Sequence, residues 1–323
     1  MRSVFIFLSF IILSITSLNG CATPSLIKAA YYGDVNTITK LIEEGQDVNL
    51  QGGSWHETAL SAASRQGHME SVKILLDSGA NPNISTKYGG NALTGATWKC
   101  HSDIARLLVR KGAEINQRNF SHGSTPLMLA VECNDESLVR FLLDHGAKTD
   151  IKNRANNDAL MAATMKGFSR MAQILIDYGA DVNSKGCGNQ TAIYQAAEKN
   201  SVETLKILIE NGANVNHQIY ASCKDGYFNS VPIPGWTALM IASAEGYTEA
   251  VKILLGSGAD PNMAAQNGRT ALMVAAGEGN IEIVKLLLDN HADTAIKDKE
   301  GRTAIDLAII MKHKEIVSLL ENR

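Results

Sequence analysis

The sequence has no excess of charge of either sign. Its 323 residues include 30 Lys and Arg against 33 Asp and Glu, which gives a formal net charge of −3. Proteins that bind nucleic acid usually carry a positive field that attracts phosphate groups. The near-neutral balance excludes such a field, and we expect no nucleic-acid partner.

Motifs of catalysis, metal binding and cofactor binding are also missing. The sequence has no His-Glu-x-x-His, no Gly-Lys-Ser/Thr phosphate loop and no nucleophile elbow. The segment Gly186-Cys187-Gly188 lacks the third glycine of a dinucleotide-binding loop. His68 and His101 recur at one period, which indicates a structural role rather than a metal site. We therefore expect no enzyme activity, no bound metal and no cofactor.

The N-terminal apolar run falls short of the length that spans a membrane. Val4 to Leu18 is interrupted only by Ser and Thr and follows the positive Arg2, whereas a spanning helix needs about 20 apolar residues. A short run of this kind behind a positive residue is typical of an export signal, and we assign residues 1–20 to it. A membrane anchor close to the start is the less favoured alternative.

The end of that run, Leu18-Asn19-Gly20-Cys21, resembles a bacterial lipoprotein box. The resemblance implies cleavage before Cys21 and attachment of lipid to its thiol. The residue after Cys21 is Ala22. An Asp at this position would keep such a protein from reaching the outer membrane, so Ala22 favours transfer to it. We expect an exported protein that faces the periplasm and touches the membrane only through this anchor. The alternative is an ordinary secretory signal and a soluble periplasmic or secreted protein.

What the sequence does contain is a repeated unit. The dipeptide Gly-Ala recurs every 33 or 34 residues, with one longer interval of 46, at Gly79, Gly112, Gly146, Gly179, Gly212 and Gly258. A period of this length is typical of a stacked helical solenoid. Each repeat in a solenoid contacts only its neighbours, so the chain grows in one dimension.

Residues 58–83 show what one repeat contains. Gly67 separates a first helix from a second one, whose face carries Val72, Leu75 and Leu76 at the helical period. Helices this short are marginal alone, so we expect neighbouring repeats to bury their apolar faces. The slot that caps the first helix holds capping residues throughout: Thr58, Asn91, Thr125, Asp158, Thr191, Thr237, Thr270 and Thr303.

The segments Thr125-Pro126-Leu127, Gly67-His68 and Gly258-Ala259-Asp260 resemble the ankyrin repeat. The resemblance covers residues 24–323 and implies an all-α solenoid of about nine helix-turn-helix repeats. It also implies β-hairpin fingers between the repeats and a concave binding face. Within a domain at residues 21–323 we place a capping unit at about 24–52, repeats at about 53–298 and a final cap at about 299–323.

The positions that this fold leaves free are the finger tips and the exposed ends of the first helices. In the first four units they carry aromatic residues and one arginine, the types that dominate the energetics of protein interfaces: Tyr32, Trp55, Arg65, Tyr88, Trp98 and Phe120. We predict that these residues bind a protein partner. The alternative for each ring is packing against a neighbouring finger.

A further column consists of methionines and one tyrosine. Two interpretations apply to it, an adaptable binding strip or, as we favour, packing between repeats. Its members are Met128, Met161, Tyr194, Met240 and Met273.

The interval of 46 residues exceeds the period by 13, and the excess lies in the finger between Asn216 and Gly235. We place this insertion at about residues 219–233. Its aromatic residues Tyr227 and Phe228 favour a recognition role, since loops on a rigid scaffold commonly carry function. The alternative is a tolerated loop that folds back on its own repeats.

Four cysteines besides Cys21 would meet an oxidising compartment in an exported chain. Cys187 and Cys223 lie in neighbouring fingers, and we predict a disulfide between them. For Cys100 and Cys133, on adjacent repeats, a disulfide and a pair of buried thiols both stay open. Thiols are favoured, because helices pack about 10 Å apart and a disulfide needs Cα atoms within about 7 Å.

These patterns predict a non-enzymatic, monomeric protein-interaction module. Two narrower functions are consistent with an ankyrin lipoprotein of the bacterial envelope. One is an immunity-type inhibitor of a periplasmic toxin or lipase. The other is a scaffold that supports a periplasmic stress-defence enzyme. The identity of the partner does not follow from the residues, because a fold does not specify a function.

Overall fold

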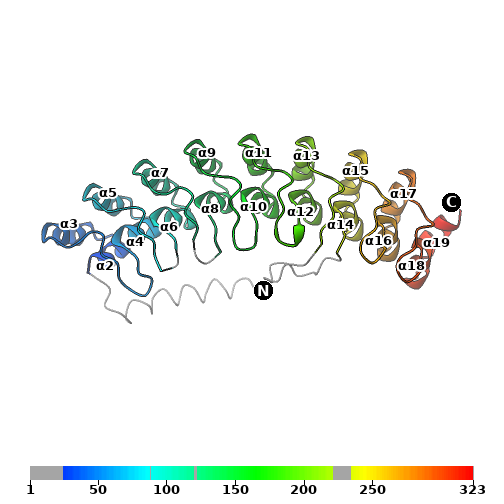
Figure 1. Ribbon diagram of the computed structural model, residues 1–323, viewed down its shortest axis with the longest axis horizontal. Helices are drawn as coiled ribbons and strands as arrows, with labels where there is room; N and C mark the ends of the chain where they lie inside the picture. Colours follow the sequence, from blue (N-terminus) through cyan, green and yellow to red (C-terminus); the bar gives the residue numbers. More distant parts are fainter. Residues whose placement is uncertain (1–24, 88, 120–121, 221–233, 323) are drawn as a thin grey trace. The chain divides into compact units, whose positions relative to one another are not determined.

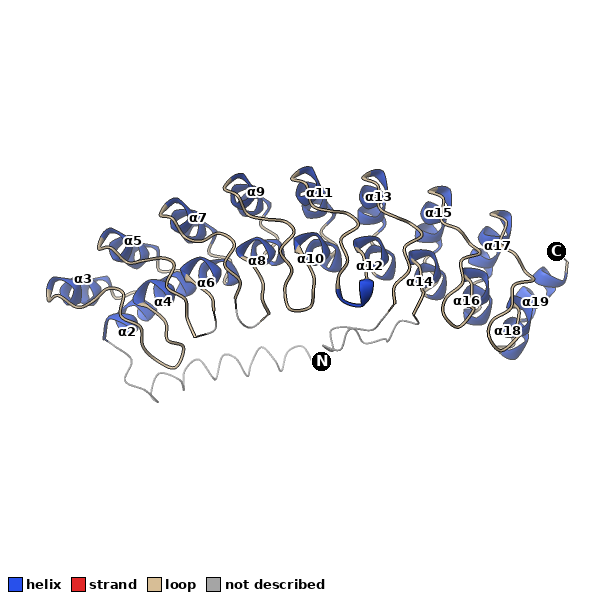
Figure 2. Cartoon of the chain, in the orientation of Figure 1, coloured by secondary structure: helices blue, strands red, loops and turns tan. Residues whose placement is uncertain are grey.

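A computed structural model of the chain describes residues 25–87, 89–119, 122–220 and 234–322. In these ranges the chain is built from short helices and loops (Figure 2). It divides into two compact units, Met1–Arg154 and Ala155–Arg323. The predicted export signal and Cys21, which follows it, lie outside the described residues.

The first unit contains four helix pairs in its described part. The first helices of the pairs form a layer beside the fingers, and the second helices form another layer behind them (Figure 1). Each first helix packs against the first helix of the next pair. The helices are α2 (Ser25–Tyr32), α3 (Val35–Glu43), α4 (Ala59–Gln66), α5 (Met69–Asp77), α6 (Ala92–Trp98), α7 (Ser102–Arg110), α8 (Pro126–Glu132) and α9 (Glu136–Asp144).

The second unit repeats this design with five pairs, so the described residues contain the nine pairs that the sequence predicts. A single-turn helix, η2 (Cys187–Asn189), lies in one of its fingers. Its α-helices are α10 (Ala159–Lys166), α11 (Ser169–Asp177), α12 (Ala192–Glu198), α13 (Val202–Glu210), α14 (Ala238–Ala244), α15 (Thr248–Gly256), α16 (Ala271–Glu278), α17 (Ile281–Asp289), α18 (Ala304–Ile310) and α19 (Lys314–Glu321).

Capping side chains start the first helices as predicted, with two exceptions. Thr58 Oγ1 accepts a hydrogen bond from the backbone N–H of Ser61 at 3.2 Å, and five other predicted caps act in the same way. Thr191 does not cap α12, and its hydroxyl has no hydrogen-bond partner. At α18 the direction is reversed, because the Asp306 carboxylate accepts from the backbone N–H of Thr303 at 2.8 Å.

The core of each unit consists of the apolar faces that stacking buries. Leu75 and Val72 of α5 are fully buried, as are the matching positions of the second helices from α7 to α17, whereas Leu41 of α3 and Val317 of α19 are only partly buried. The predicted methionine column is also buried: Met128, Met161, Tyr194, Met240 and Met273 are each at most 2% exposed. This column therefore packs between repeats, and the alternative of an exposed binding strip is wrong.

The fingers are turns and loops where the resemblance implied β-hairpins. Among the described residues one isolated antiparallel bridge occurs, between Gly52 and Glu57. The fingers are also held by links to their neighbours. Asn83 in the first unit shows how: its Nδ2 donates to the Gly112 carbonyl at 3.0 Å, and its Oδ1 accepts from the Glu114 N–H at 2.6 Å. The fingers thus combine backbone hydrogen bonds of their own, such as that from the Thr86 N–H to the Gly90 carbonyl at 2.8 Å, with links to their neighbours.

The long finger of the second unit is closed at its base like a short one. The backbone N–H of Ile219 donates to the Trp236 carbonyl at 3.0 Å, and in the next finger Ala265 donates to Arg269 at 2.9 Å. The 13 extra residues therefore lie between Ile219 and Trp236. Residues 221–233, which include Cys223, Tyr227 and Phe228, lie outside the described residues.

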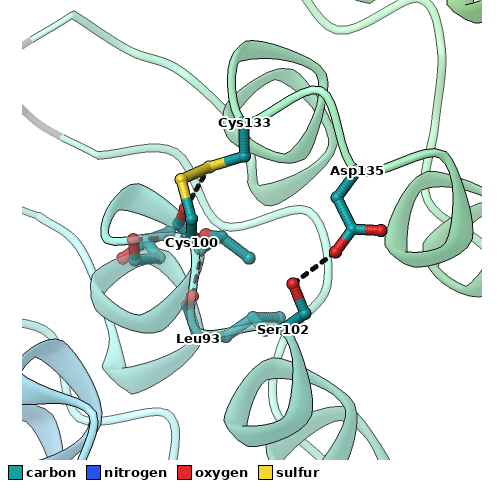
Figure 3. Close-up of a disulfide and its surroundings, with 7 residues drawn as sticks. Leu93, Cys100, Ser102, Cys133 and Asp135 are labelled. Carbon is teal, nitrogen blue, oxygen red and sulfur yellow. Dashed lines mark hydrogen bonds between the residues drawn. A yellow bond between two sulfur atoms is a disulfide. The ribbon is translucent and has the colours of Figure 1, made fainter.

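Cys100 and Cys133 form a disulfide between the ends of α6 and α8 (Figure 3). Their Cα atoms are 5.7 Å apart, which corrects the preference for two buried thiols. The helix-packing distance was the wrong measure, because both residues lie in the turns beyond the helices. Beside them Ser102 donates a hydrogen bond to Asp135 and makes a second link between the same repeats. Cys187 is also disulfide-bonded, and its pairing with Cys223 stays a prediction.

Histidines begin three of the described second helices, α5, α7 and α19, and contact the preceding repeat. His68 Nε2 lies 3.0 Å from the Tyr31 carbonyl oxygen, and its ring packs on Gly33. His101 takes the same position on Gly67, where a side chain at the glycine would collide with the imidazole. These contacts confirm the structural role that was predicted for His68 and His101.

We expect His101 to make stability depend on pH. Burial lowers its pKa below the usual value, with a hydrogen bond to the Arg65 backbone opposing this shift. The unfolded chain therefore takes up the proton first, so the stabilisation is complete above about pH 6.5 and declines as the pH falls toward the folded pKa. Urea unfolding at pH 7.5 and 5.5 should show a smaller pH effect in His101→Asn than in the native chain. Equal pH effects in the two proteins would contradict this assignment.

Candidate functional site

Four of the predicted partner-binding residues lie in the described part of the first unit: Tyr32, Trp55, Arg65 and Trp98. Tyr88 and Phe120 lie outside the described residues. The four come from α2, the first finger, α4 and α6, so successive repeats supply them (Figure 1).

Arg65 is the centre of a cluster of aromatic residues. Its guanidinium lies 5.1 Å from the Trp55 ring centroid and 5.6 Å from that of Tyr31. Nη2 also donates to both carboxylate oxygens of Glu57, at 3.2 and 3.0 Å. The arginine side chain is only 13% exposed. It therefore orients the two rings, and it offers little of its own surface to a partner.

Tyr32 extends the cluster into solvent. Its ring meets Tyr31 edge-on, with centroids 5.1 Å apart, and 60% of its surface is exposed. A large ring that is held on one side and free on the other is suited to contact a partner, because little conformational freedom remains to be lost on binding.

Trp98 ends α6 and is 44% exposed. The Lys99 Nζ atom lies 4.5 Å from the centre of its ring, which is a cation–π distance. α6 packs closely on α4 at this point, since a Cβ atom added at Gly95 would lie 3.4 Å from the Arg65 Cβ. The small residue lets the two first helices approach each other.

These side chains share one position in the repeat, two residues before the residue with positive φ that follows each first helix. In the first unit that position holds Tyr31, Arg65, Trp98 and Glu132. We call these four residues, together with the adjacent Tyr32, the first-helix row. It is a rigid strip, because every member stands on the last turn of a buried helix.

Glu57 was missed by sequence reasoning. It precedes the cap Thr58 and lies eight residues before Arg65, a spacing that carries no helical signal. Only the folding of the finger back onto α4 brings the two charges together. An acidic residue directly before the cap of a helix that ends in arginine is the one signal that the sequence offered.

The end of the second unit exposes both polar and apolar side chains. Lys312, Lys314 and Glu315 are exposed. However, Ile309, Ile310 and Met311 at the end of α18 are each 55% exposed as well. They are apolar because the repeat pattern places them where an additional repeat would be stacked.

Two other kinds of feature are absent from the described residues, a metal site and a membrane-spanning helix. These residues contain no group of three or more His, Cys, Asp or Glu side chains that could hold a metal ion. Over the same ranges, none of the helices has both the length and the apolar character needed to cross a membrane.

Comparison with protein families gives one consistent match. Residues 26–119, 127–219, 184–265 and 239–323 match the family described as ankyrin repeats in three copies. The matched segments together cover nearly the whole described chain.

Individual relatives match over less than half of this chain. The putative ankyrin repeat protein YahD of Escherichia coli (strain K12) is 31% identical over 150 residues, which is 45% of this chain and 74% of YahD. Protein PhlB of Serratia liquefaciens is 33% identical over 149 residues, 46% of this chain and 65% of PhlB. The phosphocholine transferase AnkX of Legionella pneumophila is 25% identical, and the match spans 41% of this chain but only 14% of AnkX.

Proposed function

Because the chain belongs to the ankyrin-repeat family, we propose that it is a non-enzymatic module that binds another protein through the first-helix row of its first unit. The observation that carries this proposal is the pair of exposed rings, Tyr32 and Trp98, on either side of the ordered Arg65 cluster. Aromatic residues of this kind supply most of the binding energy at protein interfaces.

The transferase named among the relatives does not suggest a reaction for this chain. The match covers only 14% of AnkX, and it lies in the part of this chain that consists of ankyrin repeats.

We also propose that the module works from a lipid anchor at Cys21, on the periplasmic side of the outer membrane. The apolar run Val4 to Leu18, the cysteine that follows it and Ala22 support this location. The disulfide between Cys100 and Cys133 is in keeping with it, because such bonds persist in oxidising compartments. Labelling with a radioactive fatty acid tests the anchor: the native chain should incorporate it and Cys21→Ser should not.

The binding proposal predicts the loss of a partner when the two exposed rings are removed. The full chain with a C-terminal tag is captured from detergent-solubilised envelopes, beside Tyr32→Ala/Trp98→Ala. Truncating an interface hot spot removes about 2 kcal/mol or more, so the partner of the native chain should bind the variant about thirtyfold or more weakly.

The control is Tyr178→Ala, which removes an exposed ring at the end of α11 in the second unit. It should retain the partner. If the double variant also retains it while both proteins stay folded, the first-helix row is not the binding surface. The partner's identity then decides between an inhibitor of a toxin or lipase and a scaffold for a stress-defence enzyme.

A further inference from the structure

The ends of the fingers in the first unit carry basic residues and no acidic ones. We call the described finger segments 50–56, 84–87, 89–90, 117–119, 122–123 and 151–154 the fingertip edge. It contains Lys87, Arg118, Lys152 and Arg154, two histidines, and no Asp or Glu. Residues 25–154 as a whole contain 14 basic and 14 acidic residues. The charges are therefore separated within a neutral unit.

Contacts between fingers hold this edge together. The backbone N–H of Lys87 donates to the Trp55 carbonyl at 2.9 Å. Arg118 Nη1 donates to the Lys152 carbonyl at 3.0 Å, and the Arg154 N–H donates to the His122 carbonyl at 2.8 Å. Lys87, Arg118 and Arg154 are exposed. Lys152, His122 and Arg154 make further contacts, so Lys87 and Arg118 are the two cations best placed to meet a partner.

The edge is continuous with the first-helix row. Trp55 of the fingertip edge connects the two, since its carbonyl accepts a hydrogen bond from the Lys87 backbone while its ring lies against Arg65 of the row. Lys99 adds an exposed cation directly beside Trp98. A partner that touches the rings of the row therefore also meets cations on the fingers.

We infer that the partner of the first unit presents an acidic polypeptide segment that carries an apolar side chain. Its carboxylates lie against Lys87, Arg118 and Lys99, and its apolar side chain packs on Trp98, the exposed ring beside Lys99. This inference rests on the proposed function and specifies the chemistry of its partner. Complementary charge of this kind sets the choice of partner and the rate of association.

A nucleic acid fits the surface less well. Binding to its backbone depends on neutralising several phosphates at once, and the unit has no net positive charge to attract them. The one arginine of the first-helix row already holds the Glu57 carboxylate. The combination of few cations with exposed rings favours a polypeptide.

Selection from a phage-displayed library of random peptides on the full chain tests the inference. We expect the enriched peptides to be rich in Asp and Glu with at least one large apolar residue, and their binding to weaken as salt is raised. The charge reversal Lys87→Glu/Arg118→Glu should slow association of these peptides about tenfold. The matched control Lys206→Glu/Lys252→Glu reverses two exposed lysines of α13 and α15 and should leave association unchanged.

Several results would overturn the inference. Enriched peptides without acidic bias, no enrichment, or equal binding by the two charge-reversal variants would each do so. So would tighter binding of a single-stranded oligonucleotide, or of vesicles of phosphatidylglycerol, that depends on Lys87 and Arg118. Peptides of neutral composition that are lost in Tyr32→Ala/Trp98→Ala would leave the proposed function intact and remove only the acidic partner.

Discussion

Replacing Arg65 with alanine is expected to lower the free energy of unfolding by about 3 kcal/mol. The Glu57 carboxylate is 11% exposed and receives both of its hydrogen bonds to Arg65 from Nη2. Without the guanidinium, a charge stays buried with its main partner gone, and the Trp55 and Tyr31 rings lose the group between them. Urea unfolding followed by circular dichroism measures the difference.

Two further variants distinguish a buried ion pair from a general effect of removing charge. Lys73→Ala breaks an exposed pair with Glu70 on α5 and should change stability by less than about 0.5 kcal/mol. Arg65→Ala combined with Glu57→Gln should recover part of the loss, since no buried charge then remains. If Arg65→Ala is as mild as Lys73→Ala, the cluster does not organise the first-helix row.

Replacing both Cys100 and Cys133 with serine should lower the free energy of unfolding by about 2–4 kcal/mol. The disulfide closes a loop with a sequence separation of 33 and so restricts the unfolded chain. The repeats that it joins also share the hydrogen bond from Ser102 to Asp135. These repeats should therefore stay stacked in the variant while the unfolding midpoint falls.

The corresponding controls are the single variants Cys100→Ser and Cys133→Ser, measured without a reducing agent. Each single variant leaves one thiol and should lose as much stability as the double variant, because either change opens the same loop. An unchanged midpoint in the double variant would show that the bond adds nothing to the stacking of α6 on α8. Trp98 precedes Cys100 by two residues, so the same proteins also report whether the bond positions that ring for binding.

The repeats could be predicted from the sequence because their signals are local. A capping residue, an apolar face and a glycine at a fixed period each act within one helix pair, so one repeat predicts the next. Thr191 shows the limit of this reasoning. It occupies the capping column, yet its hydroxyl makes no hydrogen bond. The residue type at a repeat position therefore does not determine which rotamer its side chain adopts.

The candidate site was harder to predict because its geometry depends on contacts between repeats. The column of Arg65 correctly places it at the end of a first helix. Nothing local indicates that Glu57 and Trp55 fold over it from the finger. The disulfide was missed for a related reason. Cys100 adopts a positive φ of 59° in the turn after α6, which brings its Cα atom nearer to Cys133 than the helix axes lie.

Because the base of the long finger is closed, the finger of the second unit is suited to the insertion of other sequences. Ile219 and Trp236 meet as the ends of a short finger do, so the residues between them are not needed to align α13 with α14. Lengthening a loop raises the entropic cost of closing it only slightly, by about 0.6 kcal/mol for each doubling of its length. A foreign peptide grafted between these two residues should thus be displayed on an unchanged scaffold, and the chain can acquire a new specificity without refolding its repeats.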